Sequence, residues 1–401
     1  MANKKQEIKE VYLDYSATTP MSSEVYREML DVYQRTYGNS SSLHYAGRSA
    51  SGVLEQARLR IANVIGAKPG EIYFTSGGTE SDNWAIKGVA RANKDKGNHI
   101  ITSCIEHPAV LESCKALEKE GFKITYIPVN ADGVVDYAEI IKAISPETIL
   151  ISIMLANNEV GSIQPIRAIS ELAHTQNVLV HTDAVQALGS IPVNVEDLGV
   201  DLMSLSGHKV YGPKGVGVLY IKNGTKIAKF MDGGEQEKDM RAGTCDVPAI
   251  AGMGKAVEIA CKEQEKNAQT LKNISRYFWK KANERIYNIW LNGSLANRLP
   301  GNLNIGFEGV EGEALLMMLD QKGIAVSTGS ACASGSLSPS HVLIAMGKTA
   351  DEAHSSIRFS FGKHITPAEI DYAIEELYKA VKKLRSISAV RIYKDKGGDE
   401  D

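Results

Sequence analysis

The stretch Asp201-Leu-Met-Ser-Leu-Ser-Gly-His-Lys209 places a lysine at the end of a short apolar run. Tyr211-Gly-Pro-Lys-Gly215 follows and predicts a tight turn before the next apolar run, residues 216–221. A lysine at the end of a buried strand is unusual, because burying an ammonium group is costly unless its charge is used or its pKa falls. A lysine with a lowered pKa can bond covalently to an aldehyde cofactor. The alternative is a surface-loop lysine that merely follows a strand.

Short apolar runs alternate with helical periods on both sides of this stretch, from about Asp14 to Glu258. Helix-like segments such as 49–65 and 165–176 separate several of the runs. This alternation predicts an α/β fold with a largely parallel sheet covered on both faces, which places ligands at the carboxyl ends of its strands. The apolar runs are residues 71–75, 99–102, 123–127, 149–154, 178–182, 202–205 and 216–221.

A polar helical stretch begins near residues 252–265 and runs towards Trp290, and we interpret it as the connection into a second, smaller α/β unit. Thr366-Pro-Ala-Glu369 predicts the start of a last helix, with Thr366 as N-cap and Glu369 completing a capping box. We predict a large domain over residues 15–262 and a small domain formed by residues 1–14 and 263–401.

Composition and charge exclude several classes of protein. The chain has 401 residues, 23% of them charged, and a net charge of -3, so it has no basic footprint for nucleic acid. The longest apolar stretch, residues 149–156, is too short to cross a membrane, and residues 1–10 contain no secretory signal. Five cysteines without a C-x-x-C pair favour reduced thiols and a cytoplasmic protein.

A carboxylate ends another apolar run, in His181-Thr-Asp183. In that place Asp183 can keep a pyridinium nitrogen protonated, which makes pyridoxal phosphate an effective electron sink. Gln186, three residues on, can reach the phenolic oxygen of the ring. The alternative for Asp183 is an N-cap on a following helix.

Two further segments suggest contacts to such a cofactor. Thr75-Ser-Gly-Gly-Thr-Glu80 follows a strand and opens a helix, so free N–H groups near Gly78, with the hydroxyls of Thr79 and Ser206, can bind phosphate. Many ordinary strand–helix turns look the same. His107 can stack on a flat ring and exchange protons, or can be a packing residue. Cys104 and His107 are half a metal site without a second pair, so we predict no metal.

The order of these pieces closely resembles the fold type I pyridoxal phosphate enzymes, and among them the cysteine desulfurases of the NifS/IscS kind. The resemblance extends from Tyr12-Leu-Asp-Tyr-Ser-Ala-Thr-Thr-Pro20 to Ile357-Arg-Phe-Ser-Phe-Gly362, through Asn157-Asn-Glu-Val-Gly161. It implies a large domain with a mainly parallel seven-stranded sheet and a smaller α/β domain. It also implies removal of sulfur from L-cysteine, which leaves L-alanine.

The resemblance assigns roles to residues that the pattern alone leaves open. Cys332, in Ser327-Thr-Gly-Ser-Ala-Cys332-Ala-Ser-Gly-Ser336, would be the nucleophile that carries a persulfide to an acceptor protein such as an iron–sulfur scaffold. The alternative for this cysteine alone is a small residue in a Gly-rich turn. Lys209 would remove the substrate Cα proton, and His107 would assist proton transfers at the substrate thiol and at the cofactor. Arg358 would bind the substrate carboxylate, Asn158 would hold the cofactor and the substrate, and His208 would contact the cofactor. Thr244 would bind the cofactor phosphate of the other subunit of a homodimer.

One stretch departs from the family pattern. In Gly233-Gly-Glu-Gln-Glu-Lys-Asp239, Glu235 and Asp239 stand where the family has glycines, and added negative charge weakens a phosphate site unless Lys238 or Arg241 offsets it. A selenocysteine lyase or a carbon–sulfur lyase of the same fold is the nearest rival function. An aminotransferase would leave Cys332 without a purpose. The departure favours a third rival, a sulfur-carrier or assembly platform with poor turnover.

Overall fold

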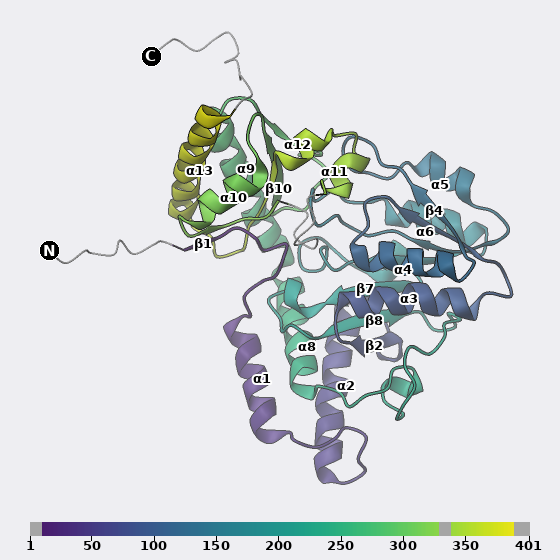
Figure 1. The fold of residues 1–401 in the computed structure, drawn as a ribbon. Coiled ribbons are helices and arrows are strands. Elements are labelled where there is room, and N and C mark those ends of the chain that lie inside the picture. Colours follow the sequence, from purple (N-terminus) through teal and green to yellow (C-terminus); the bar gives the residue numbers. More distant parts are fainter. Residues whose placement is uncertain (1–9, 329–337, 389–401) are drawn as a thin grey trace.

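The computed structural model describes residues 10–328 and 338–388. Its centre is a seven-stranded sheet in the order β2-β8-β7-β6-β5-β3-β4 (Figure 1). The strand β8 alone runs antiparallel to both of its neighbours, so the prediction of a mainly parallel seven-stranded sheet is confirmed. The strands are β2 (Ile72–Thr75), β3 (His99–Ser103), β4 (Lys123–Ile127), β5 (Thr148–Ser152), β6 (Leu179–Asp183), β7 (Leu202–Ser206) and β8 (Gly217–Ile221).

Helices cover both faces of this sheet because successive apolar residues of a strand point to opposite faces. Ile100 packs with α3 (Gly78–Ala92) and α4 (Pro108–Lys119). Its neighbour Ile101 packs in the other core. That core includes α2 (Tyr45–Ile65), α5 (Tyr137–Ala143), α6 (Ile166–Thr175) and α8 (Val247–Lys262), together with Val25 of α1 (Ser23–Arg35) and Val195 of α7 (Val195–Leu198).

A second, three-stranded antiparallel sheet lies at the upper left of Figure 1, in the order β12-β10-β9. Phe278, Phe359 and Leu377 belong to its own buried core. The capping box of Thr366 and Glu369 is present at the start of α13, as predicted. The elements of this part are α9 (Gln264–Arg285), β9 (Ile289–Leu291), β10 (Asn302–Phe307), α10 (Gly312–Asp320), α11 (His341–Ala345), α12 (Ala350–His354), β12 (Ser356–Ser360) and α13 (Pro367–Ile387).

The segment after the first strand connects the two sheets. β1 (Val11–Tyr12) pairs with β11 (Ile324–Ala325) beside the small sheet. Asp14 then bridges to Ser360, and the backbone N–H of Thr19 donates to the carbonyl of His208 at 3.0 Å. Residues 14–19 therefore lie where the end of β12 approaches the loop after β7.

The polar helical stretch predicted after residue 252 is two helices, since α8 ends at Lys262 and α9 begins at Gln264. The predicted strand 123–127 has the observed bounds, and the other predicted segments differ from the observed ones by a few residues at their ends. Among the residues that the structure describes, no helix is both long and apolar enough to cross a membrane. The division at residues 15–262 stays a prediction.

Candidate active site

The predicted site residues gather at the carboxyl edge of the large sheet. β2, β3, β5, β6 and β7 point in one direction, so the loops that follow them meet at one edge. Their topology explains why segments far apart in sequence converge there. The strand ends, loops and helix starts at this edge carry Gly78 and Thr79, His107, Asn158, Asp183, and Ser206 with His208 and Lys209.

Lys209 ends a short 3-10 helix, Gly207–Lys209, directly after β7. Its Nζ donates to the backbone carbonyls of Ser16 at 2.5 Å and Ala17 at 2.9 Å. The side-chain Nε2 of Gln186 donates to the same Ser16 carbonyl at 2.8 Å. The segment at residues 16–17 therefore holds the lysine and the glutamine next to each other, a contact that sequence reasoning missed.

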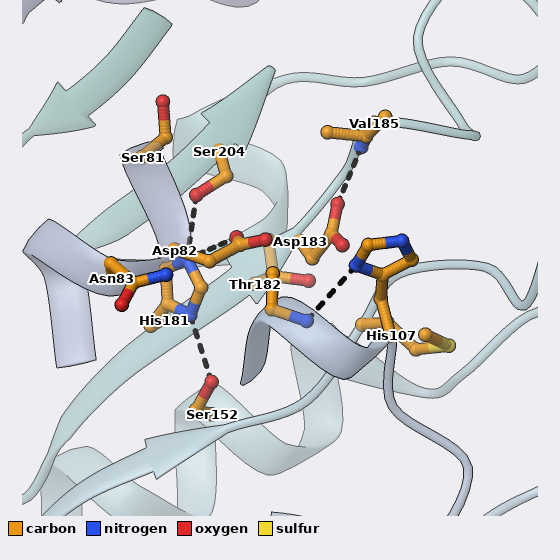
Figure 2. Close-up of polar contacts among 12 residues, drawn as sticks. Ser81, Asp82, Asn83, His107, Ser152, His181, Thr182, Asp183, Val185 and Ser204 are labelled. Carbon is orange, nitrogen blue, oxygen red and sulfur yellow. Dashed lines mark hydrogen bonds and ion pairs between the residues drawn. The ribbon is translucent and has the colours of Figure 1, made fainter. Parts of the chain in front are cut away.

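Asp183 ends β6 and its side chain is buried. Its Oδ1 accepts the backbone N–H of Val185 at 2.8 Å, but turns rather than a helix follow, so the N-cap alternative is wrong (Figure 2). Burial raises the pKa of Asp183, while His107, the Val185 N–H and Lys209 each act to lower it. The pKa is still raised overall, because burial is the largest effect and these groups oppose it only in part.

His107 is the N-cap of α4 and its Nδ1 accepts the backbone N–H of Ala109 at 3.1 Å. An accepting Nδ1 carries no proton, so the neutral ring bears its proton on Nε2. Burial lowers the pKa of His107, and this favours the neutral ring. The ring can therefore donate one proton from Nε2 and take it back.

A hollow at the start of α3 is suited to a phosphate group. Gly77 precedes the helix with φ 156°, and a Cβ on Gly78 would lie 2.8 Å from the Val185 side chain, so glycine is needed there. The first N–H groups of the 15-residue α3 have no side-chain cap in the described chain. The residues that line the hollow include Thr79, Ser206, His208 and Lys214.

His208 belongs to the wall of this hollow and has Nδ1 3.1 Å from the Thr18 hydroxyl. Burial, then the charges of Lys209 and Lys214, lowers its pKa to about 4. Because a neutral His208 adds no charge, the positive groups described for this hollow are the Lys214 side chain and the first N–H groups of α3.

Arg358 reaches the site from β12 of the small sheet and is 2% exposed. Its Nη2 donates to Asp14 Oδ1 at 2.7 Å and its Nη1 to the Asn158 carbonyl at 3.1 Å. Its Nε has no hydrogen-bond partner among the described residues. The guanidinium therefore has N–H groups left for a carboxylate. Asp14 has no signal in the sequence beyond its place in the Tyr12–Pro20 motif.

Cys332 lies outside the described residues, but the positions on either side of that stretch contact the site. Ser327 pairs with Arg358 through two backbone hydrogen bonds of 3.2 and 2.6 Å. Ser340 donates its hydroxyl to Glu159 Oε2 at 2.5 Å, next to Asn158. Ser327 and Ser340, which stand on either side of residues 329–337 in the sequence, thus lie beside residues predicted to bind substrate.

The other four thiols are poor nucleophiles, because burial raises the pKa of each one. The pKa of Cys114 rises to about 12 and that of Cys261 to about 11. Cys104 and Cys245 shift in the same direction. No group of ligands that could hold a metal ion occurs among the described residues.

One of the two added carboxylates in the stretch that departs from the family pattern, Asp239, is ion-paired. Asp239 contacts Lys229 at 2.6 Å, and Arg241 contacts Glu80 at 2.8 Å. Lys229, rather than Lys238 or Arg241, therefore offsets Asp239. Thr244 is exposed and does not line the phosphate hollow of its own chain.

Known proteins are similar to this chain over nearly its whole length. The model of the family described as aminotransferase class-V matches residues 11–373. A cysteine desulfurase IscS from Dictyoglomus turgidum is 53% identical over 380 residues, which cover 95% of this chain and 96% of that protein. Among solved structures, a NifS-like protein has a TM-score of 0.89 at 39% identity, covering 94% of this chain and 100% of its own. SspA in complex with cysteine has a TM-score of 0.78 at 37% identity and covers 88% and 99%.

Proposed function

The chain belongs to the class-V aminotransferase family, and on that premise we propose that it is a pyridoxal-phosphate-dependent cysteine desulfurase. It takes sulfur from L-cysteine, leaves L-alanine and carries the sulfur as a persulfide on Cys332. The observation that carries the proposal is the meeting of Lys209, Asp183 and Arg358 at one sheet edge, beside a hollow suited to phosphate.

Different residues at this edge would bind different parts of the cofactor. Thr79, Ser206 and His208, with the N–H groups at Gly78, would hold the phosphate, and Asp183 would hold the pyridine nitrogen. Gln186 and Asn158 would contact the ring, and Lys209 would hold the aldehyde. When bound, pyridoxal phosphate supplies an electron sink for negative charge that develops at the substrate Cα.

The chain's own groups then act on the amino acid. Arg358 binds the substrate carboxylate with the N–H groups that Asp14 and Asn158 leave available. Lys209 takes the Cα proton once its Nζ leaves the Ser16 and Ala17 carbonyls. His107 moves protons through Nε2, since its Nδ1 is occupied.

Transfer of the sulfur requires one nucleophilic thiol, Cys332. The Cys332 thiolate attacks the substrate sulfur, an S–S bond forms as the substrate C–S bond breaks, and the carbon skeleton takes up protons to become alanine. The raised pKa values of the four described thiols favour Cys332 as the nucleophile by contrast. The persulfide then passes to an acceptor protein, for which an iron–sulfur cluster scaffold is our proposal. A thiol that must stay reduced between turnovers suits the cytoplasm.

An exposed apolar stripe supports a homodimer. Tyr26, Leu30 and Tyr33 of α1 are 58%, 42% and 60% exposed, although the opposite face of α1 already packs on α8. A second copy seated on this stripe would cover it. Thr244 lies just before α8 and does not line the phosphate hollow of its own chain, which leaves it available for the cofactor phosphate of the other subunit.

The test is release of alanine and sulfide from L-cysteine by Cys332→Ala, with Cys261→Ala as the matched control. We expect Cys332→Ala to keep the visible absorption of the bound cofactor and to lose sulfide release in the presence of thiol, and Cys261→Ala to behave as wild type. Unchanged sulfide release by Cys332→Ala would contradict the role of this thiol. Competition between cysteine and selenocysteine as substrates distinguishes a cysteine desulfurase from the alternative, a selenocysteine lyase.

A further inference from the structure

A polar layer lies beneath Asp183, between the sheet and α3. His181 stands two residues before Asp183 on β6, so both side chains point to the same face. The His181 Nδ1 lies 2.8 Å from the Ser152 hydroxyl of β5, and its Nε2 lies 3.0 Å from the Ser204 hydroxyl of β7 (Figure 2). Each ring nitrogen thus faces a hydroxyl from a neighbouring strand.

Asp82 of α3 completes this layer. Its side chain is 2% exposed, and its Oδ1 lies 3.7 Å from His181 Nε2. That oxygen has no hydrogen-bond partner within the described chain. Neither lysine nor arginine forms an ion pair with Asp82 in residues 10–328 and 338–388. An ionised Asp82 would therefore be a buried anion without a cation, which is strongly unfavourable.

The surrounding charges act in the same direction. Burial, then repulsion from Asp183, raises the pKa of Asp82 well above its usual value. A hydrogen bond from the Ser204 hydroxyl acts to lower it, and the Glu106 carboxyl adds a smaller increase. Burial lowers the pKa of His181 to about 3. Glu106, whose pKa burial raises to about 8, is the other acid that faces this region. Burial, the missing cation and the neighbouring carboxyl groups therefore all favour an uncharged layer, with a proton on Asp82 and one on His181.

We propose that Asp82 and His181 are positioning residues of the cofactor site: an uncharged acid–imidazole pair that leaves Asp183 as the single anion of this buried layer. A second anion here would raise the pKa of Asp183 and weaken its hold on a protonated ring nitrogen. A protonated His181 would compete with that nitrogen for Asp183. The inference rests on the proposed function, because it concerns the ring nitrogen of pyridoxal phosphate.

The charge state is tested first by infrared difference spectroscopy on the full chain, with and without cofactor. At pH 7, wild type minus Asp82→Asn should contain the carbonyl band of a protonated carboxyl group shielded from water. Glu106→Gln is the matched control, because it removes a different buried acid and should leave the Asp82 band in place. Carboxylate bands in place of the carbonyl band would overturn the proposal.

The positioning role is tested by the pH dependence of the visible absorption of the bound cofactor. Asp82→Asn keeps the shape and the lack of charge, so its midpoint should stay within about 0.3 pH unit of wild type. Asp82→Ala removes the partner of Ser204 and His181 and should shift the midpoint by about one unit or more. A wild-type midpoint in Asp82→Ala, or an equal shift in both variants, would reject the role.

The two tests separate this inference from the proposed function. A chain that takes up no pyridoxal phosphate would refute the proposed function, and the infrared band of the cofactor-free chain would still decide the charge of Asp82. A chain that binds cofactor and shows an ionised Asp82 would overturn only the inference.

Discussion

Replacing Glu237 by Gln tests the buried ion pair that holds the loop before Thr244. Arg58 and Glu237 side chains are each 3% exposed and contact through two hydrogen bonds, Nη2 to Oε1 at 2.8 Å and Nη1 to Oε2 at 3.0 Å. The Glu237 carboxylate also accepts the backbone N–H of Phe74 at 2.8 Å. The Arg58 guanidinium lies 4.8 Å from the centre of the Phe74 ring. Glu237 therefore joins the loop to both α2 and β2.

The expected cost follows from the burial of the partner that remains. Removing one member of a buried ion pair typically destabilises a protein by about 3–5 kcal/mol, since the other charge stays buried without compensation. Glu237→Gln keeps the shape and a carbonyl oxygen for the Phe74 N–H, so we expect the lower end, about 3 kcal/mol. Arg58 also donates to the Ile72 carbonyl and to Glu55, which limits the loss. The double variant Arg58→Met/Glu237→Gln should cost less than the sum of the single changes.

The assay is equilibrium urea unfolding of wild type, both single variants and the double variant, followed by tryptophan fluorescence. A lower midpoint with an unchanged dependence on urea shows a change in stability rather than in the surface exposed on unfolding. A cost of Glu237→Gln below about 1 kcal/mol, the value of an exposed pair, would refute the reasoning. Additive single costs would show that the two side chains do not act as a pair.

Three further predictions concern single positions. Asp239 has φ 61°, a backbone conformation that glycine adopts without strain. Asp239→Gly should therefore be more stable than Asp239→Ala by about 1 kcal/mol in urea unfolding, because both variants lose the Lys229 contact and only alanine keeps the strain. Equal stabilities of the two variants would contradict this. Burial raises the pKa of Glu159 to about 7, so its protonated form is favoured in the folded chain and this contribution to stability falls as pH rises from about 4.5 to 7. Glu159→Gln lacks that contribution, and its stability relative to wild type should rise over the same range, whereas a constant difference would argue against the shift. Arg358→Lys should raise the KM for cysteine about tenfold or more with cofactor content unchanged, because an ammonium cannot replace the planar fork, and an unaltered KM would exclude a carboxylate contact.

Much of the fold could be predicted because its signals are local. Residues 123–127 were predicted as a strand and β4 has those bounds, and the Thr366 capping box stands where the motif placed it. Ends of other elements shifted because tertiary contacts extend or shorten them. The helix predicted from residue 49 begins at Tyr45, where the His44 side chain caps it by accepting the Gly47 N–H at 3.3 Å.

The sequence by itself determined which chemical groups stand at the ends of which strands, since short periods and motifs specify strands, turns and helix starts within a few residues. Tertiary structure alone decided which groups meet and what charge they carry. Arg358 pairs with Asp14 across 344 positions, a contact that requires β12 to lie beside the segment after β1. The charge of Asp82 likewise depends on its burial against β6, because desolvation acts on a group only once the surrounding chain has excluded water from it.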